Sequence, residues 1–329
     1  MRDTHWKSVK NGLLSNMKVY RTIDEISYRE DSILTLGTFD GIHLGHQKII
    51  ENLVYEARQK KARSVLVTFY PHPQTVVNSR RERIGLLTPL NEKVEILENT
   101  GLDVVIFIPF TRELANTEPE VFIEDLLLKH VGIRKFVIGY NHAFGRGRRG
   151  GEKLFQELGK RLDFSVEVMS PVIMDGESIS STRIRTLLKE GNVRRANRLL
   201  GRNYSLYGLV KKGEKLGEKI GFPTANVDVL GENKLVPRDG VYAVIVKIEG
   251  EKLTGMANLG FKPTVQGKKR GLEVHIHEFE GDLYGKRLKI MFIQRLRDEK
   301  QFDSMDALVT QIELDQQKSM ELLSKYIRR

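Results

Sequence analysis

The stretch GTFDGIHLGH, from Gly37 to His46, joins an apolar run at residues 33–36 to an amphipathic segment. This order predicts a strand, a glycine-rich turn and a helix that begins near Gly45. The three glycines of the stretch allow the backbone to approach a ligand closely, and a helix start directs free N–H groups toward an anion. His43 and His46 are three residues apart, so both can face one ligand. The stretch therefore predicts a phosphate-binding turn.

Short β-rich runs alternate with helical patterns on both sides of this turn, as far as about residue 185. Apolar residues recur at helical spacing over 49–57, Thr88 and Pro89 are expected to cap the next helix, and Thr117 with Glu120 is expected to form a capping box. The β-rich runs are 33–36, 65–69, 104–108, 136–138 and 166–169. Alternation of this kind predicts a Rossmann-like α/β domain with a parallel sheet covered by helices.

The pattern changes after two short basic helices, which are predicted at 182–188 and 193–200. Strands then dominate, separated by glycine-rich turns, and a last amphipathic helix is expected over 304–326. The predicted strands are 206–210, 241–248, 253–259, 272–277 and 288–292. Their spacing predicts a small antiparallel β-barrel or sandwich with a C-terminal helix.

Composition limits the classes of protein that need to be considered. A chain of 329 residues with 40% hydrophobic content can form two domains. The 54 Lys and Arg against 43 Asp and Glu give a formal charge of +11, which favours nucleotides, nucleic acid or acidic membranes as partners. The absence of cysteine excludes disulfides and thiolate metal sites and suits a cytoplasmic protein. We find no membrane span or signal peptide, and expect folded structure from Met17 onward.

The H-x-G-H pattern of the turn suits nucleotidyl transfer, because that reaction builds negative charge on the α-phosphate and on departing pyrophosphate. A second segment, ISSTRIR at 179–185, places hydroxyls and two guanidinium groups ahead of a helix, where they can bind triphosphate oxygens. Each motif has a simpler interpretation, in which the histidines and the Ser/Thr residues merely cap helices and the arginines are solvated.

The basic run GRGRRGG at 145–151 supports a non-enzymatic alternative, because Arg-Gly runs bind RNA phosphates and stack on bases. The run follows the predicted strand at 136–138, however, where ligand-binding loops of parallel sheets gather. We therefore favour a mononucleotide site.

Four motifs together, GTFDGIHLGH, TFYPHP at 68–73, GYNHAFGRGRRG at 139–150 and ISSTRIR, resemble in order and spacing the adenylyltransferase half of bacterial bifunctional riboflavin kinase/FAD synthetases. GFPTAN at 221–226, GVYAV at 240–244, ANLGFKPTV at 257–265 and LEVHIHEF at 272–279 resemble the kinase half of the same family. The resemblance covers nearly the whole chain from Met17.

For the first domain, this resemblance implies that His43 and His46 stabilise charge during adenylyl transfer. It also implies a set of nucleotide- and flavin-binding residues at the turn, the basic loop and the ISSTRIR segment. These are Gly37, Phe39, Asp40, Asn141, Phe144, Arg146, Ser180, Ser181, Thr182, Arg183 and Arg185.

For the second domain, the resemblance implies that Gly221, Pro223, Thr224 and Asn226 hold Mg-ATP, with Thr224 and Asn226 as the Mg²⁺ ligands. Oxygen donors of this kind suit a hard cation. The resemblance further implies that Glu273 is the general base, and that Arg297 and Phe302 lie at the flavin site.

Simpler interpretations of the second domain stay open from the residues alone. Gly-Phe-Pro-Thr can be only a turn, and Glu273 can be a solvent-facing residue of an alternating strand. His275 and His277 share its face, so a metal cluster there is conceivable, although the resemblance assigns this strand to kinase chemistry.

The function implied is therefore bifunctional flavin synthesis. Residues 186–329 would phosphorylate riboflavin with ATP to give FMN, and residues 17–185 would adenylylate FMN with a second ATP to give FAD and pyrophosphate. Neither nucleic acid nor membrane is an expected partner. The alternatives are another H-x-G-H nucleotidyltransferase, which leaves the GFPTAN half without a role, and an RNA-binding protein, which explains the charge but neither set of motifs.

Overall fold

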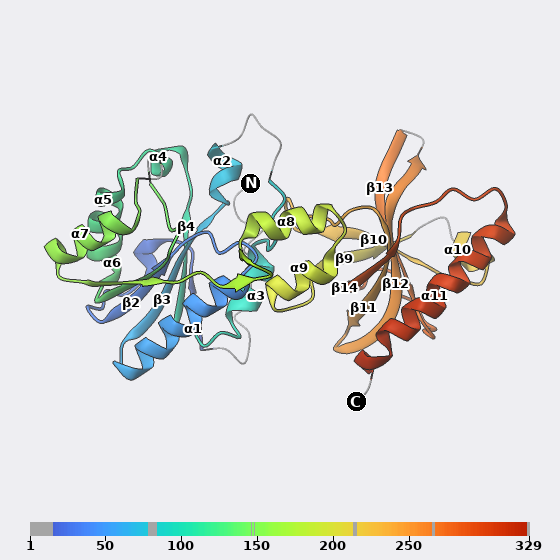
Figure 1. Ribbon diagram of the computed structural model, residues 1–329, viewed down its shortest axis with the longest axis horizontal. Helices are drawn as coiled ribbons and strands as arrows, with labels where there is room; N and C mark the ends of the chain where they lie inside the picture. The colour runs from blue at the N-terminus through green and yellow to red at the C-terminus, as the bar shows by residue number, and fades with distance from the viewer. Residues whose placement is uncertain are drawn as a thin grey trace. The chain divides into compact units, whose positions relative to one another are not determined.

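The computed structural model describes residues 16–77, 84–145, 147, 149–212, 216–264 and 267–327. The chain divides into two compact units, with the boundary between Ser181 and Thr182 (Figure 1).

The first unit is built on a six-stranded parallel sheet with the strand order β1-β4-β3-β2-β5-β6. All five residues of β2 are buried, which is the pattern expected of a parallel strand covered on both faces. The strands are β1 (Lys18–Tyr20), β2 (Ser32–Leu36), β3 (Arg63–Tyr70), β4 (Val104–Pro109), β5 (Lys135–Gly139) and β6 (Ser165–Met169). The predicted Rossmann-like sheet is confirmed, and the edge strand β1 was not expected from the sequence.

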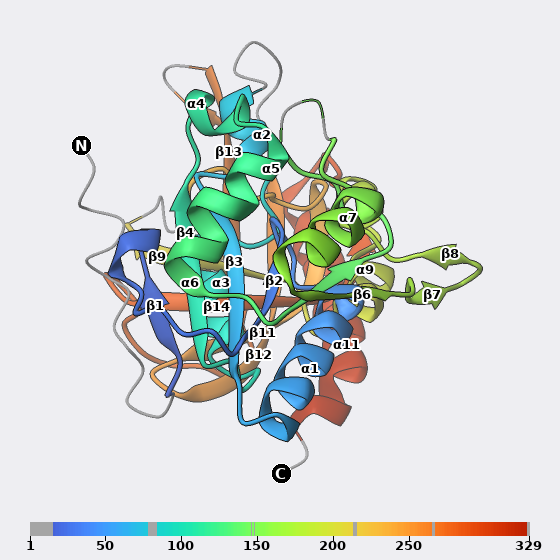
Figure 2. The same ribbon diagram turned by 90° about the vertical axis from the view of Figure 1, so that its left-hand side faces the viewer.

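Helices cover both faces of this sheet. Helices α1 (Leu44–Gln59) and α3 (Leu90–Leu97) pack with Ile33, Leu66 and Val105 on one face. The π-helical turn η2 (Phe122–Leu128) and helix α7 (Glu152–Leu162) pack on the other face. The shorter elements are η1 (Ile23–Glu25), α2 (Pro73–Val77), α4 (Arg112–Ala115), α5 (Pro119–Val121), α6 (Lys129–Val131) and a hairpin of β7 (Ile173–Met174) and β8 (Glu177–Ser178), which projects in Figure 2.

The two predicted helix caps are wrong, because tertiary partners take the side chains. Helix α3 has Pro89 as its N-cap without a side-chain cap bond, and the Thr88 hydroxyl instead lies 3.2 Å from a carboxylate oxygen of Asp40. Helix α5 begins after Glu118, and Thr117 donates its hydroxyl proton to the Glu113 carbonyl at 3.1 Å. Threonine is a suitable capping residue, but both threonine hydroxyls make hydrogen bonds with other partners instead.

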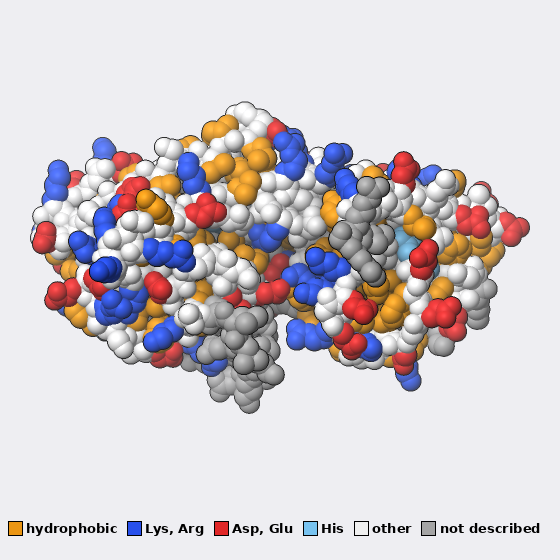
Figure 3. Space-filling model, turned by 90° about the horizontal axis from the view of Figure 1, so that it is seen from below, with side chains coloured by type: hydrophobic (Ala, Val, Ile, Leu, Met, Phe, Trp, Pro, Cys, Tyr) orange, Lys and Arg blue, Asp and Glu red, His pale blue; other side chains and the backbone are white. Residues whose placement is uncertain are grey.

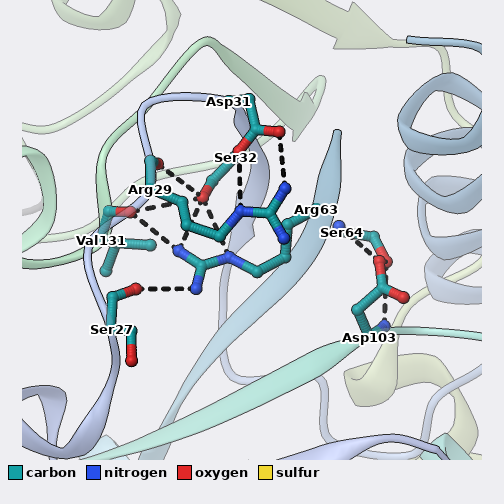
Figure 4. Close-up of polar contacts among 8 residues, drawn as sticks. All are labelled: Ser27, Arg29, Asp31, Ser32, Arg63, Ser64, Asp103 and Val131. Carbon is teal, nitrogen blue, oxygen red and sulfur yellow. Dashed lines mark hydrogen bonds and ion pairs between the residues drawn. The ribbon is translucent and has the colours of Figure 1, made fainter. Parts of the chain in front are cut away.

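The buried guanidinium of Arg63 lies at the amino-terminal ends of the strands and binds several segments there (Figure 4). The Gly37–His46 turn lies at the opposite, carboxyl-terminal ends of the strands. Arg63 donates to the Ser32 hydroxyl at 2.8 Å, to the Ser27 carbonyl at 2.8 Å and to the Val131 carbonyl at 2.9 Å. Burial lowers the pKa of Arg63, and the nearby charge of Arg29 acts in the same direction. The three acceptors come from separate segments, so one side chain ties them together.

The second unit is a closed antiparallel barrel with the strand order β10-β13-β12-β11-β14-β9. Its strands are β9 (Ser205–Lys211), β10 (Ala225–Leu230), β11 (Gly240–Ile248), β12 (Glu251–Thr264), β13 (Gly267–Ile276) and β14 (Arg287–Arg297). Its helices are α8 (Ser181–Lys189), α9 (Val193–Leu200), α10 (Leu216–Lys219) and α11 (Met305–Ile327), and α8 begins at the last residue of the first unit. The predicted barrel and C-terminal helix are confirmed. Leu323 of α11 packs on Ala243, Ile245 and Ile293 of the barrel.

Surface charge is mixed on the face shown in Figure 3, where Lys and Arg side chains are interspersed with Asp and Glu. Within the described part of the chain, no helix combines the length and the apolar character needed to cross a membrane.

Candidate active sites

The GTFDGIHLGH turn lies at the switch point of the parallel sheet. It follows β2, which has β3 as its neighbour on one side and β5 on the other. From β2 the chain adds β3 and β4 in one direction, and later adds β5 and β6 in the opposite direction. The loop after β5, which contains Asn141, leaves the same edge of the sheet. Ligands of open α/β sheets bind at this position, outside the carboxyl ends of the strands.

The turn has an uncommon backbone conformation. Phe39 and Ile42 have φ values of 44° and 37°, and Gly41 has φ 91°. Positive φ is a genuine outlier for a bulky or β-branched residue, and such strain occurs mostly at ligand sites. Space is also limited at Gly45, since a Cβ there would lie 3.2 Å from the ring of His43, a tight contact.

Asp40 and Ser181 hold the turn from inside. The Asp40 carboxylate is 1% exposed and accepts from the backbone N–H groups of Leu87 at 3.1 Å and Thr88 at 2.9 Å. The Ser181 hydroxyl donates to the Asp40 carbonyl at 2.7 Å, and the Gly41 N–H donates to the Thr88 hydroxyl at 2.9 Å. These contacts show that Asp40 and Ser181 support the turn, and their predicted contact with the nucleotide stays a prediction.

The two histidines lie together at the start of α1. His43 is the N-cap, and its Nδ1 accepts from the His46 N–H at 3.3 Å, so the neutral form carries its proton on Nε2. The two rings stack with centroids 3.7 Å apart, and Phe39 lies 5.0 Å from the ring of His46. The capping interpretation and the ligand interpretation are therefore compatible, because the cap bond of His43 involves Nδ1 alone.

The loop after β5 is anchored through Phe144. Its backbone pairs with Gly150 in both directions at 3.1 and 3.0 Å, and its ring packs 5.6 Å from Phe122 and 5.4 Å from Phe155. Phe144 thus fixes the base of the loop, and its predicted contact with flavin stays a prediction. Asn141 is exposed. Arg146, also predicted to bind ligand, lies outside the described residues.

The ISSTRIR segment reaches the turn through its first residues. Ile179 is buried, and its carbonyl lies 4.0 Å from the position of a Cβ on Gly45. Ser180 is half-buried and precedes α8. The remaining predicted residues follow Ser181 within α8 and belong to the second unit; Thr182 is exposed, whereas Arg183 and Arg185 are half-buried.

On the barrel, three polar residues lie side by side across three strands. Asn226 of β10 and Asn258 of β12 are both register partners of Glu273 on β13. The neighbours of Glu273 along its strand, Leu272 and Val274, are buried in the barrel, so Glu273 points to the opposite face. The structure thus brings the predicted base beside the predicted metal ligand Asn226. Asn258 was not predicted, and only the strand register could have revealed it.

The GFPTAN turn is tied to the same strand by His275. Its Nδ1 lies 2.8 Å from the Pro223 carbonyl, and its ring makes an edge contact with Phe222 at 5.6 Å. Gly221 has φ 83°, which favours glycine. Thr224, the residue after Pro223, is exposed. Within the described residues no group of three or more His, Cys, Asp or Glu is arranged to hold a metal, so the conceivable His275–His277 cluster has no support.

Arg297, the last residue of β14, lies beside Phe302 of the following segment. The guanidinium of Arg297 lies 5.7 Å from the Phe302 ring centroid and donates to the Asp315 carboxylate at 2.7 Å and to the Asp298 carbonyl at 2.9 Å. Asp315 of α11 is 4% exposed. The Asp298 carboxylate accepts from Arg295 at 2.6 Å, which lowers the pKa of that carboxyl.

The fold and both sites define an enzyme that transfers groups from a nucleoside triphosphate in two separate units. Residues 25–183 match the FAD synthetase family and residues 200–323 match the riboflavin kinase family. The chain is 35% identical over 298 residues to the bifunctional riboflavin kinase/FMN adenylyltransferase of Listeria monocytogenes, covering 90% of this chain and 93% of the relative. The enzyme of the same description from Escherichia coli K12 is 37% identical over 303 residues, covering 91% and 96%.

The chain therefore belongs to the family of bifunctional riboflavin kinase/FMN adenylyltransferases. Its first unit carries the FAD synthetase activity, its second unit carries the riboflavin kinase activity, and ATP is the co-substrate. The predicted function is confirmed, and the RNA-binding and other H-x-G-H alternatives are set aside.

A solved structure supports the fold. A crystal structure described as a macrolide-efflux protein from Streptococcus pneumoniae superimposes with a TM-score of 0.83 at 30% identity, covering 92% of this chain and 98% of that one. The two chains share the same architecture, although that structure is described by a different activity.

Proposed function

We propose that adenylyl transfer takes place at the Gly37–His46 turn, where FMN phosphate attacks the α-phosphate of ATP and pyrophosphate leaves. The observation that carries this assignment is the strained turn at the switch point, with both histidines stacked at the start of α1. Imidazole donors, together with the N–H groups of the helix start, suit the charge that develops on the phosphates. Arg183, Arg185 and the Ser180–Thr182 hydroxyls then contribute to binding the triphosphate, and Asn141 contributes to binding the flavin. The predicted role of Arg146 in ligand binding rests on the sequence alone.

Phosphorylation of riboflavin is proposed to occur at the outer face of β10 and β13. Glu273 takes the proton from the attacking ribityl hydroxyl, and a positioned base of this kind contributes about 10²- to 10⁴-fold. Thr224 and Asn226 would hold Mg²⁺, which supplies charge stabilisation at the transferring phosphoryl group. The donor set fits that ion, since a hydroxyl and an amide oxygen leave room for the waters and phosphate oxygens that Mg²⁺ prefers.

Further parts of the proposal concern boundaries, partners and location. We place the functional boundary between residues 185 and 186, so that the whole ISSTRIR segment belongs to the adenylyltransferase. Gly221 and Pro223 shape the ATP turn, and Arg297 with Phe302 borders the flavin. We further propose a cytoplasmic enzyme that acts on small molecules and not on nucleic acid or membranes.

The test uses one reaction with two products. The protein is incubated with riboflavin, ATP and Mg²⁺, and the flavins are separated by chromatography. His46→Ala should depress FAD formation from FMN at least about 100-fold and leave FMN formation at the parent rate. Glu273→Gln should do the reverse, by about 100-fold or more.

Each variant controls for the folding of the unit that the other affects. Lys48→Ala, an exposed change on the same helix as His46, is the matched surface control. Loss of both activities in either variant, or full retention of the activity assigned to the substituted residue, contradicts the assignment.

A further inference from the structure

A lysine lies buried behind the Gly37–His46 turn. Lys93 is the fourth residue of α3, is 5% exposed and donates from Nζ to the Thr38 carbonyl at 2.7 Å. Lysine is almost never fully buried unless it is paired. Its burial therefore requires an explanation that the packing of an amphipathic helix does not supply.

The electrostatic surroundings keep Lys93 largely charged at neutral pH. Burial lowers its pKa to about 8, and the Asp40 carboxylate acts in the opposite direction. Asp40 also accepts from Leu87 and Thr88, so its negative charge is shared among several donors. A positive charge is thus held within the fold beside the turn.

The carbonyl that accepts from Lys93 belongs to the peptide that precedes Phe39, one of the two residues of the turn with an unusual positive φ. The Thr38 carbonyl accepts from Lys93 and also from the Thr68 hydroxyl at 3.2 Å. In a trans peptide the C=O and N–H bonds point in opposite directions, so this arrangement turns the Phe39 N–H away from Lys93. Phe39 is 3% exposed with φ 44°, and its N–H makes no hydrogen bond to the described residues. Such a buried donor requires a partner.

We propose that Lys93 is a positioning residue for adenylyl transfer, whose ammonium group fixes the Thr38–Phe39 peptide so that its N–H faces the triphosphate, and whose charge stabilises that anion from behind the turn. The inference rests on the assignment of adenylyl transfer to this turn. It adds a residue that does not touch the substrate and that the motifs do not contain.

The absence of cysteine from the chain permits a test by chemical replacement. Lys93→Cys introduces a single thiol, which is alkylated in urea with 2-bromoethylamine or with 1-iodopropane before refolding. The two adducts have nearly the same length and shape, and only the first ends in an ammonium group. Riboflavin phosphorylation by the second unit reports the yield of refolded chain in each sample.

In FAD formation, we expect the enzyme with the aminoethyl adduct to have a kcat/KM for ATP about 10- to 100-fold higher than that of the enzyme with the propyl adduct. The KM for FMN should be equal in the two enzymes within about twofold. Lys93→Met, expressed directly without refolding, should match the propyl adduct, and Thr68→Val should have the smaller effect because it removes a neutral donor. Equal adducts, or a Lys93→Met enzyme with the parent kcat/KM for ATP, would overturn the proposal. His46→Ala is assayed in parallel; if it too is fully active, the assignment of the turn fails and not the role of Lys93 alone.

Discussion

Acid should destabilise the barrel through one buried histidine. His277 directly follows β13 and is 6% exposed, and its Nε2 lies 3.1 Å from the Ser319 hydroxyl of α11. That hydroxyl donates to the Gly255 carbonyl at 3.1 Å, so it can only accept from His277. The proton of the neutral ring is therefore on Nε2, and Nδ1 is buried without a hydrogen-bond partner among the described residues.

The sign of the effect follows from the direction of the pKa shift. Burial, with a smaller contribution from the charge of His275, lowers the pKa of His277 from 6.5 to about 4. As the pH falls, the unfolded chain binds this proton first, so the stability is fully present above pH 6.5 and is lost progressively toward pH 4. The complete shift corresponds to at most about 3 kcal/mol, and the loss between pH 7.5 and pH 5 is about 2 kcal/mol.

The assay is urea titration of the full chain at pH 7.5 and pH 5, followed by peptide-resolved hydrogen exchange. Peptides from β12 and β13 report the barrel, and peptides from β2 and β3 serve as the internal reference. His277→Gln retains an N–H donor for Ser319 but cannot titrate, so its barrel should lose about 2 kcal/mol less than the parent barrel over this pH interval. An equal loss in the parent and in the Gln variant would refute the reasoning.

Two further predictions concern the residues that support the sites. Asp40→Asn should destabilise the first unit by about 3 kcal/mol. The amide N–H₂ then replaces one of the two oxygens that accept from the Leu87 and Thr88 N–H groups, and the charge opposite Lys93 is lost. An unchanged thermal unfolding of that unit would contradict this prediction. His275→Gln should raise the KM for ATP in riboflavin phosphorylation about 10-fold, whereas the KM of His275→Asn should stay near the parent value. The two variants should differ because only the side-chain amide of Asn places a donor where the Nδ1 of His275 contacts the Pro223 carbonyl. Equal kinetics of the two variants would exclude this tether.

The sequence predicted those parts of the fold that depend on local pattern. The runs at 33–36 and 65–69 are apolar except for one threonine each because β2 and β3 are buried on both faces, and such strands are recognisable without tertiary information. The glycine-rich turn between β2 and α1 was predictable for the same reason, since a strand, a turn and a helix follow one another in sequence.

What the sequence could not predict depends on contacts between distant segments. Strand β10 was missed because it follows directly on the turn residues Pro223 and Thr224, and its pairing with β9 and β13 makes the segment extended. Lys93 was missed because an amphipathic pattern assigns lysine to the solvent face. Its burial depends on the Thr38 carbonyl, which lies 55 residues earlier in the chain.

The energies at the Gly37–His46 turn indicate why function there should be more sensitive than stability. Positive φ at Phe39 and at Ile42 costs about 1–3 kcal/mol each. The bond that Thr88 accepts from the turn and the bonds that Lys93 and Ser181 donate to it contribute about 0.5–1.5 kcal/mol each when neutral and up to about 3 kcal/mol when charged. Because these opposing contributions are similar in size, loss of one bond shifts the turn toward a relaxed conformation while the buried sheet beneath it stays folded. Substitutions behind the turn should therefore lower the rate of adenylyl transfer before they measurably lower the unfolding temperature.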